Sequence, residues 1–490
     1  MYDNRHVISR SEAIIAIESL YSEVVSVLHD AATLFIPSTC KNACKFWWSC
    51  QLSQLKADSV NANRLWVSVG KPRSGPIFSH RQSTRRAYRS ELHSNQEYYK
   101  NYYSDALHDS LMQKDGSSFW KCWRSKFDSR PANFSVCGSV NNVFVCNKFY
   151  DYFRSIVIPN SPTRDAALHN EFDRCYAEFC RHDCRFDDIF DIDVISDAIS
   201  GLKRGKAVGP DGISAEHLHF SHPVLSSILL RLFNLLIFYS YVPNSFCVSY
   251  TVPLLKVKDF LAKSLECSDF RGIAISNIIS KCFEYCLLSK ISGHFNTSDN
   301  QFGFKSGQGC GHAIYTARKI IDAYVEGGDT AHLCALDISK AFDKVNLYGL
   351  FIKLMKRNIP RSILDLLIYW LPRCCTYIKW NGICSKIFGL TVGVRQGSVL
   401  APLLFSIYVN DISSACNQSY FGEILLYADD ILILARSLMG LQKLFDDVQA
   451  ELSWLDLRLN YDKSVSMRVG PRFDRACLPI TTFLKLPIEL

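Results

Sequence analysis

The sequence predicts a mixed fold of the α+β or α/β class, and three observations support this. From about residue 188 onward, segments with apolar residues at helical spacing alternate with short β-rich runs. The chain has 490 residues, of which 48% are hydrophobic, so it can build a large core in several domains. It contains no internal repeat and no long low-complexity tract. These features exclude a helix bundle and a disordered chain.

Charge and cysteine usage indicate the setting. The net charge of +8 favours a polyanionic partner such as nucleic acid over small acidic substrates. The 20 cysteines are scattered, and the first residues lack the charged-then-apolar pattern of a secretion signal. We therefore expect an intracellular protein of the nucleus or cytoplasm that is not secreted. A zinc site at Cys175, Cys180, His182 and Cys184 is disfavoured, because the spacing matches no zinc motif.

The first 130 residues are expected to be mostly helical and basic. Residues 11–30 open with a serine cap, Ser11, and carry apolar residues at helical spacing. Further along, basic residues alternate with Phe78 and Tyr88, as on surfaces that bind single-stranded nucleic acid; the basic residues assigned to such a surface are Lys71, Arg73, Arg85, Arg86 and Arg89. A solvated linker explains this stretch equally well.

The main domain boundary is expected between 130 and 185, where prolines interrupt the pattern. Beyond it we expect helices at 188–203, 223–241 and 275–292, and a strand at 249–256. The apolar segment 223–243 is interrupted by polar residues, so it predicts a buried core helix and no membrane contact.

Two adjacent aspartates, Asp429 and Asp430, interrupt the apolar run at 425–435. The flanking runs are strand-like, so the aspartates are expected at a hairpin turn. Taken alone, an acidic turn is the commoner explanation. Buried or crowded carboxylates otherwise require protonation or a cation.

A third carboxylate changes this interpretation. A strand over 333–336 is expected to deliver Asp337 at its end, with a helix following over 338–345. If the two strands lie side by side, three carboxylates converge. Hard oxygen ligands with room for phosphates suit Mg²⁺ better than Zn²⁺ or a closed Ca²⁺ cage. Two such ions support in-line phosphoryl transfer.

Three blocks, ALDISKAFD, GVRQGSVLAPLLFSIYVNDI and YADD, resemble the reverse transcriptases of non-LTR (LINE-type) retrotransposons. The segments at 202–218 and 301–314 resemble further blocks of that group. The resemblance implies an α+β right-hand polymerase fold whose antiparallel palm sheet is backed by helices. It also implies an RNA-directed DNA polymerase with two Mg²⁺ ions, or Mn²⁺ instead, and with an RNA template, a DNA primer and deoxynucleotides as partners in a ribonucleoprotein. The oligomeric state stays open.

The resemblance gives individual residues roles. The metal-binding acids would be Asp337, Asp429 and Asp430, with Lys463 protonating the leaving pyrophosphate. Nucleotide-binding residues would be Lys256, Arg271, Ile338, Phe342 and Gln396, with Phe342 beneath the sugar. Asp343 is expected to hold the start of the following helix rather than a metal. The loop residues Gly393, Arg395 and Gly397 are expected to approach nucleic acid, and the glycines would allow close backbone contact.

By the same resemblance, residues 1–130 correspond to the connector that follows an endonuclease, 131–330 to an extension and the fingers, 331–470 to the palm, and 471–490 to the start of a thumb connection. We expect the chain to be a fragment that lacks endonuclease and thumb. Two alternatives remain: a catalytically idle reverse-transcriptase fold that binds RNA, and a template-independent nucleotidyltransferase or cyclase. A template-contacting loop around Gln396 counts against the second.

Overall fold

The computed structural model describes residues 9–36, 48–127, 135–181, 190–256, 265–294, 297–305, 307–413, 422–471, 474 and 480–481. The chain divides into two compact units: residues 1–32 with 135–490, and residues 33–134. The first predicted domain, residues 1–130, is therefore shared between both units. The assignment of the predicted ranges to connector, fingers, palm and thumb stays a prediction.

The smaller unit contains three helices in its described part: α2 (Cys50–Ser68), α3 (Pro76–Met112) and α4 (Gly116–Phe127). Pro76 stands at the first turn of α3, where a missing N–H costs nothing. Arg81 of α3 stacks on the Trp66 ring at 3.8 Å and donates to the Asn63 side chain at 2.9 Å, which fastens α3 to α2. The predicted basic stretch is thus helical from Pro76 onward.

The larger unit begins with α1 (Arg10–Phe35), which extends beyond the predicted residues 11–30. Its cap is Ser9 rather than Ser11. The Ser9 hydroxyl accepts from the Glu12 N–H at 3.4 Å, and the Ser9 N–H donates to the Glu12 carboxylate at 3.1 Å. This reciprocal pair is a capping box.

In the described part of the larger unit, six helices lie between α1 and the first strand: α5 (Asn142–Ile156), α6 (Pro162–Phe179), α7 (Ile192–Gly201), α8 (Ala215–His219), α9 (Val224–Phe238) and α10 (Asn244–Cys247). Helix α9 buries eight of its side chains, including the polar Asn234, as expected for a core helix. Among the described helices, none combines the length and the apolar character needed to cross a membrane.

One sheet has five strands: β1 (Val248–Leu255), β2 (Phe270–Ser276), β4 (Cys375–Trp380), β5 (Ile383–Cys384) and β6 (Phe388–Gly389). Strand β1 pairs antiparallel with β2 and parallel with β4. Helix α11 (Ile278–Ile291) follows β2, and α13 (Leu347–Lys356) and α14 (Arg361–Trp370) precede β4. This sheet therefore joins segments more than a hundred residues apart.

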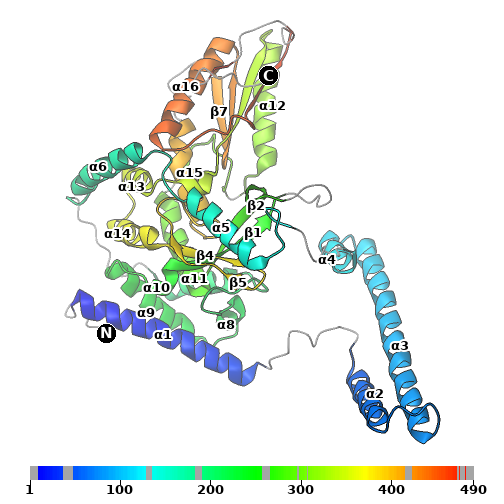
Figure 1. The fold of residues 1–490 in the computed structure, drawn as a ribbon. Helices are drawn as coiled ribbons and strands as arrows, with labels where there is room; N and C mark the ends of the chain where they lie inside the picture. The colour runs from blue at the N-terminus through cyan, green and yellow to red at the C-terminus, as the bar shows by residue number, and fades with distance from the viewer. Residues whose placement is uncertain are drawn as a thin grey trace. The chain divides into compact units, whose positions relative to one another are not determined.

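The other sheet has four antiparallel strands in the order β7-β8-β3-β9: β3 (Ala331–Asp337), β7 (Gly422–Tyr427), β8 (Asp430–Ala435) and β9 (Val465–Val469). Helix α12 (Cys310–Glu326) covers one face and α16 (Leu438–Trp454) the other, as Figure 1 shows. The apolar side chains of α12 pack on Leu333, Leu425 and Leu434 of the sheet. One antiparallel sheet, one mixed sheet and their covering helices confirm the predicted α+β class.

Helix α15 (Ala401–Val409) is buried on nearly every side, as its apolar sequence predicted. It begins directly after the loop of residues 393–400, with Pro402 in its first turn. Phe405 and Tyr408 are fully buried, so the helix fixes the end of the loop in the core.

Candidate active site

The three predicted acids meet where β3 and β8 end. Asp337, the last residue of β3, lies directly opposite Asp430, the first residue of β8. Asp429 belongs to the two-residue turn that joins β7 to β8. The expected hairpin is confirmed, and the neighbouring strand brings the third carboxylate beside it.

Backbone contacts fix the position of this turn. Ala428 has a φ of 57°, an unfavourable left-handed conformation for a residue with a side chain. The segment before α12 packs against the turn, because Phe302 N–H donates to Leu426 O at 2.8 Å. A Cβ atom on Gly303 would lie 2.2 Å from the Ala428 nitrogen, so only glycine permits this approach. The QFGF segment therefore supports the turn that presents Asp429.

The acids are only partly neutralised by protein groups. The Asp337 carboxylate accepts a hydrogen bond from the Asn460 side chain at 3.0 Å and lies 3.5 Å from the Lys463 ammonium group, which is 70% exposed. Loss of surrounding water raises the pKa of Asp430, and the charges of Asp429 and Asp337 raise it further. Mutual repulsion of this kind is expected where carboxylates are gathered for a cation.

The donor set fits hard divalent cations, although the side chains do not form a ready cage. Among the described residues, no group of three or more histidine, cysteine, aspartate or glutamate side chains is arranged to hold a metal ion. Three carboxylates on adjacent positions with uncompensated repulsion nevertheless have the chemistry that such ions require. Of the cysteine and histidine cluster considered for zinc, His182 and Cys184 lie outside the described residues.

Three of the predicted basic residues, Lys256, Arg271 and Lys463, lie close enough to influence one another's charge. Lys256, directly after β1, donates to Ser268 O at 2.6 Å. Arg271 of β2 lies opposite Leu254 of β1. Loss of hydration lowers the pKa of Lys256, and repulsion from Lys463 and Arg271 lowers it further. The two predicted nucleotide-binding cations and Lys463 therefore share one electrostatic environment, which suits an anionic ligand.

The loop of residues 393–400 is held by backbone contacts on both sides. Gly393 N–H donates to Val345 O at 2.7 Å, and Ala274 N–H of β2 donates to Gln396 O at 2.7 Å. Gly393 and Gly397 have φ values of 92° and 120°. A Cβ atom at these glycines would lie 2.7 Å from Asp343 O and 2.4 Å from Ala274 O, respectively. These two glycines therefore allow close approach to the protein's own backbone, and the predicted approach to nucleic acid stays a prediction.

Gln396 and Asp343 are joined by a hydrogen bond that the sequence did not predict. The Gln396 amide group donates to the Asp343 carboxylate at 2.9 Å. Burial raises the pKa of Asp343 to about 6, against the lowering effects of Gln396 and nearby lysines. The expected helix over 338–345 is wrong, because Lys340 is left-handed with a φ of 51° and only a short 3₁₀ helix, Ala341–Lys344, follows. Asp343 thus anchors Gln396.

Phe342 lies in a rigid aromatic group. Its ring stacks on Phe405 at 4.7 Å between centroids and meets Phe304 edge to face at 5.9 Å. Phe342 also accepts a backbone hydrogen bond from Val394 of the loop. Ile338 is buried and pairs with Leu459 through an isolated bridge. The roles predicted for both residues at a nucleotide stay predictions.

The predicted nucleic-acid contact of Arg395 is wrong for this structure. Only 8% of the residue is exposed, and its guanidinium donates to Phe246 O at 3.0 Å. Its second terminal nitrogen lies 4.0 Å from the Glu284 carboxylate. The side chain points into the core because its neighbours in the loop, Val394 and Gln396, are fixed by β2 and the 342–345 segment.

The other predicted nucleic-acid residues belong to the smaller unit. The residues Lys71, Arg73, Arg85, Arg86 and Arg89 are all exposed. The last three lie on α3 and line an open surface together with His93 and Glu97. Because these side chains are exposed, they fit both interpretations of the stretch: a surface that binds nucleic acid and a solvated linker.

Sequence reasoning missed three residues at this site: Asn460, Asp343 in its role as an anchor, and Glu284. Each acts through a partner far away in the chain. Asn460 contacts Asp337, 123 positions away, and Glu284 contacts Ser398, 114 positions away. The available signal for Glu284 was that it is the one acidic residue of a mostly apolar helix.

Comparison with known proteins identifies a family for the same region. Residues 257–475 match the family "Reverse transcriptase (RNA-dependent DNA polymerase)". The chain is 24% identical over 288 residues to the retrovirus-related Pol polyprotein of the type-2 retrotransposable element R2DM of Drosophila melanogaster, an alignment that covers 57% of this chain. It is 26% identical over 258 residues, 50% of this chain, to the RNA-directed DNA polymerase from mobile element jockey of Drosophila funebris.

These alignments cover only part of each relative. The chain aligns with 26% of the R2DM polyprotein and 27% of the jockey protein. Among solved structures, an apo telomerase of Candida tropicalis truncated from its C-terminal domain aligns at 14% identity with a TM-score of 0.35, over 47% of this chain and 52% of that one. A TM-score this low supports no conclusion about function.

Proposed function

We propose that this chain is an RNA-directed DNA polymerase of the type found in non-LTR retrotransposons; the match of residues 257–475 to the reverse transcriptase family and the similarity to the R2DM and jockey proteins support this. It would add deoxynucleotides to the 3′-hydroxyl of a DNA primer along an RNA template. One observation carries the proposal: Asp337 and Asp430 lie opposite each other at the ends of β3 and β8, with Asp429 in the adjoining turn. Carboxylates grouped at adjoining strand ends are suited to hold the divalent ions of a phosphoryl transfer.

The three acids would hold the metal ions of the reaction. Reverse transcriptases generally use divalent metal ions. We propose two Mg²⁺ ions here, with Mn²⁺ as a substitute, which would activate the attacking hydroxyl and stabilise the leaving oxygen. The Asn460 amide and the Lys463 ammonium group limit the rotation of the Asp337 carboxylate. Asp337 is thereby held facing the hairpin acids before any ligand binds.

Cations on two sides of the acids would bind the triphosphate. Lys256 and Arg271 come from β1 and β2, and Lys463 follows Asn460 in the palm. Lysine offers phosphate a point charge and arginine a forked contact. Lys463 lies within reach of the acids and would give its proton to the leaving pyrophosphate.

The loop of residues 393–400 and Phe342 would shape the pocket for the incoming nucleotide. Gln396 is fixed through Asp343, and Phe342 is fixed between Phe405 and Phe304. A ring held on two sides cannot move aside for a 2′-hydroxyl, which favours deoxynucleotides. The matching part of the chain supports RNA as the template, and we include an intracellular ribonucleoprotein setting in the proposal.

Primer extension tests the proposal directly. The purified 490-residue chain would be incubated with a DNA primer annealed to an RNA template, deoxynucleotides and Mg²⁺, beside the variant Asp429→Asn. The parent is expected to extend the primer and the variant to be inactive, because one acid of the metal site is lost. Asp322→Asn serves as the matched control, since it removes an exposed carboxylate on α12.

Each outcome separates two functions. Extension by the parent and by Asp322→Asn, but not by Asp429→Asn, supports the polymerase. Full activity of Asp429→Asn would refute the assignment of the acids. RNA binding without extension by the parent would favour the alternative of a catalytically idle fold that binds RNA.

A further inference from the structure

The loop of residues 393–400 rests on a buried ion pair that lies away from the acids. Glu284 is on α11 and is 1% exposed. One oxygen of its carboxylate accepts three hydrogen bonds: from the Ser398 hydroxyl at 2.5 Å, from Val399 N–H at 2.6 Å and from Leu400 N–H at 3.0 Å. A single buried carboxylate therefore holds the last three residues of the loop.

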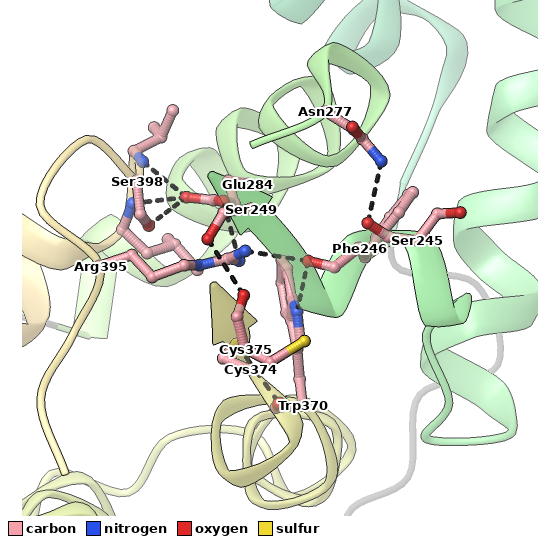
Figure 2. A network of polar contacts seen from close by, with 12 residues as sticks. Ser245, Phe246, Ser249, Asn277, Glu284, Trp370, Cys374, Cys375, Arg395 and Ser398 are labelled. Carbon is pink, nitrogen blue, oxygen red and sulfur yellow. Dashed lines mark hydrogen bonds and ion pairs between the residues drawn. The ribbon is translucent and has the colours of Figure 1, made fainter. Parts of the chain in front are cut away.

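Arg395 completes the pair from within the loop. Its guanidinium lies between the second carboxylate oxygen of Glu284, 4.0 Å away, and the carbonyl of Phe246, to which it donates at 3.0 Å. Figure 2 shows the Glu284 carboxylate facing Ser398 and the Arg395 side chain extended toward Phe246. Among the described residues, that second oxygen accepts no hydrogen bond. Arg395 is thus its nearest compensating charge.

A charged pair in the core is weak evidence for stability. Removing two charges from water costs several kcal/mol, and apolar residues of equal volume often stabilise a core as well or better. Such a pair therefore suggests a role in fixing geometry. Val399 and Leu400 immediately precede α15, so the Glu284 carboxylate fixes the start of this helix. A carboxylate at a helix N-terminus also interacts favourably with the exposed N–H groups.

Arg395 and Gln396 are consecutive residues of the loop, and their side chains point to opposite sides of the loop backbone. Arg395 points into the core toward α11, whereas Gln396, the next residue, points to Asp343. Gly397 follows Gln396 and has a positive φ, a backbone conformation that glycine adopts readily. Any rotation of the loop that released Arg395 or Ser398 would also displace the Gln396 amide group.

We propose that Glu284 and Arg395 are a positioning pair that fixes the 393–400 loop and so sets the place of Gln396 at the nucleotide. The effect on nucleotide binding rests on the proposed function, while the effect on the loop does not. The pair links α11 to the loop before α15. Gln396, the residue proposed to meet the nucleotide, is therefore held in place by residues that do not touch the nucleotide.

Two measurements on the full chain test the pair: hydrogen exchange of the amides in 393–400 without ligands, and primer extension with varied deoxynucleotide concentration. Glu284→Gln leaves Arg395 without a buried anion. We expect exchange in the loop and KM for the nucleotide to rise about tenfold each, while kcat changes little. Ser398→Ala, which removes one of three donors, should give a smaller rise in both.

A double variant separates positioning from folding. Glu284→Gln with Arg395→Met removes both charges of the pair, so Arg395 is no longer an unpaired buried cation and the urea midpoint should recover in part toward that of the parent. Lys281 on α11, which the Glu284 charge also favours, stays charged in this variant. The nucleotide KM should stay raised, because Arg395 no longer binds Phe246 O. The matched control is Glu451→Gln, which weakens the buried ion pair with Lys353 at 2.7 Å. It should lower the midpoint without changing loop exchange or KM.

The outcomes decide between the interpretations. Unchanged exchange in 393–400 for Glu284→Gln would overturn the proposal, as would an equal rise of KM in Glu451→Gln, since the effect would then be general destabilisation. If the parent chain extends no primer, the proposed function fails, and loop exchange still decides whether Glu284 and Arg395 fix the loop.

Discussion

Two sets of carboxylates in this chain have opposite surroundings. Asp337, Asp429 and Asp430 stand at strand ends, where loss of hydration and then the charges of the other two acids raise the pKa of Asp430. Glu284 and Asp343 lie beneath the 393–400 loop and receive hydrogen bonds from it. Among the described residues, the strand-end acids receive one side-chain hydrogen bond, from Asn460 to Asp337, whereas Glu284 and Asp343 each accept hydrogen bonds from the loop that they support. The difference teaches that charge alone does not mark a site; the groups around each carboxylate do.

The largest effect is expected from the strand-end acids. Asp337→Asn should lower primer extension about a thousandfold or more, because a metal ion contributes several kcal/mol of charge stabilisation in the transition state. Asp430→Asn should lower it less, by about tenfold to a hundredfold, because this exposed residue starts its strand beyond the turn. Initial rates at saturating nucleotide measure both.

Stability sharpens the comparison further. Asp430→Asn removes a repelling charge and should raise the urea midpoint or leave it unchanged. Glu284→Gln should lower it. If both substitutions lowered the midpoint equally, the two sets of carboxylates would not differ as described.

Two glycines allow each set to be disturbed by a methyl group. Gly303→Ala would press on the Ala428 nitrogen, 2.2 Å away, and should cost about 1–3 kcal/mol while lowering kcat. Gly397→Ala would press on Ala274 O, 2.4 Å away, at a φ of 120°, and should chiefly raise the nucleotide KM. Gly311 has open space around its Cα, so Gly311→Ala is the control. Identical kinetic changes in the first two variants would contradict separate roles.

The strand-end acids could be predicted from the sequence because their signal is local. An apolar strand ending in Asp337, and a hairpin carrying Asp429 and Asp430, are patterns within a few residues, and the register of β3 and β8 then aligns them. The same local reasoning predicted β1, α9 and α11 within a few residues. The α+β class and the resemblance to reverse transcriptases followed from these blocks.

The loop's supports could not be predicted, because they depend on tertiary contacts. Nothing near Glu284 indicates that it meets Ser398, and Arg395 looked like a ligand contact beside Gln396. Only the packing of α11 against the loop turns Arg395 into the core. The missing helix after Asp337 has a similar cause: the left-handed Lys340 breaks the turn, and the loop supplies hydrogen bonds to 342–345. Sequence periodicity does not contain such contacts.

A smaller effect is expected from the protonation of Asp343. Burial raises its pKa to about 6, above the value near ~4 of an unfolded chain, so the folded state keeps a proton that the unfolded state releases. The stability from the neutral carboxyl is complete below pH ~4 and is lost as the pH rises through ~6. Asp343→Asn cannot ionise, so it should be more stable than the parent above pH ~6, by up to ~3 kcal/mol.

Urea unfolding of parent and variant across this pH range measures the difference. Because asparagine can still accept from Gln396, the nucleotide KM should change little, unlike in Glu284→Gln. A difference in stability that is independent of pH would show that the Asp343 carboxyl does not titrate as its burial implies.

The smallest effect concerns Asn460, the side chain that partly saturates one strand-end acid. Its amide donates to the Asp337 carboxylate at 3.0 Å, and its backbone N–H donates to Asp337 O at 2.8 Å. Asn460→Ala removes only the side-chain bond, so it should cost about 1 kcal/mol in stability. Residues that orient a metal ligand typically change metal affinity by about tenfold or more, so the Mg²⁺ concentration for half-maximal extension should rise by that factor. Excess Mg²⁺ should then restore the rate. If the rate stayed low at any Mg²⁺ concentration, Asn460 would act on the reaction itself rather than on the orientation of Asp337, and the strand-end set would include a neutral member with a direct role.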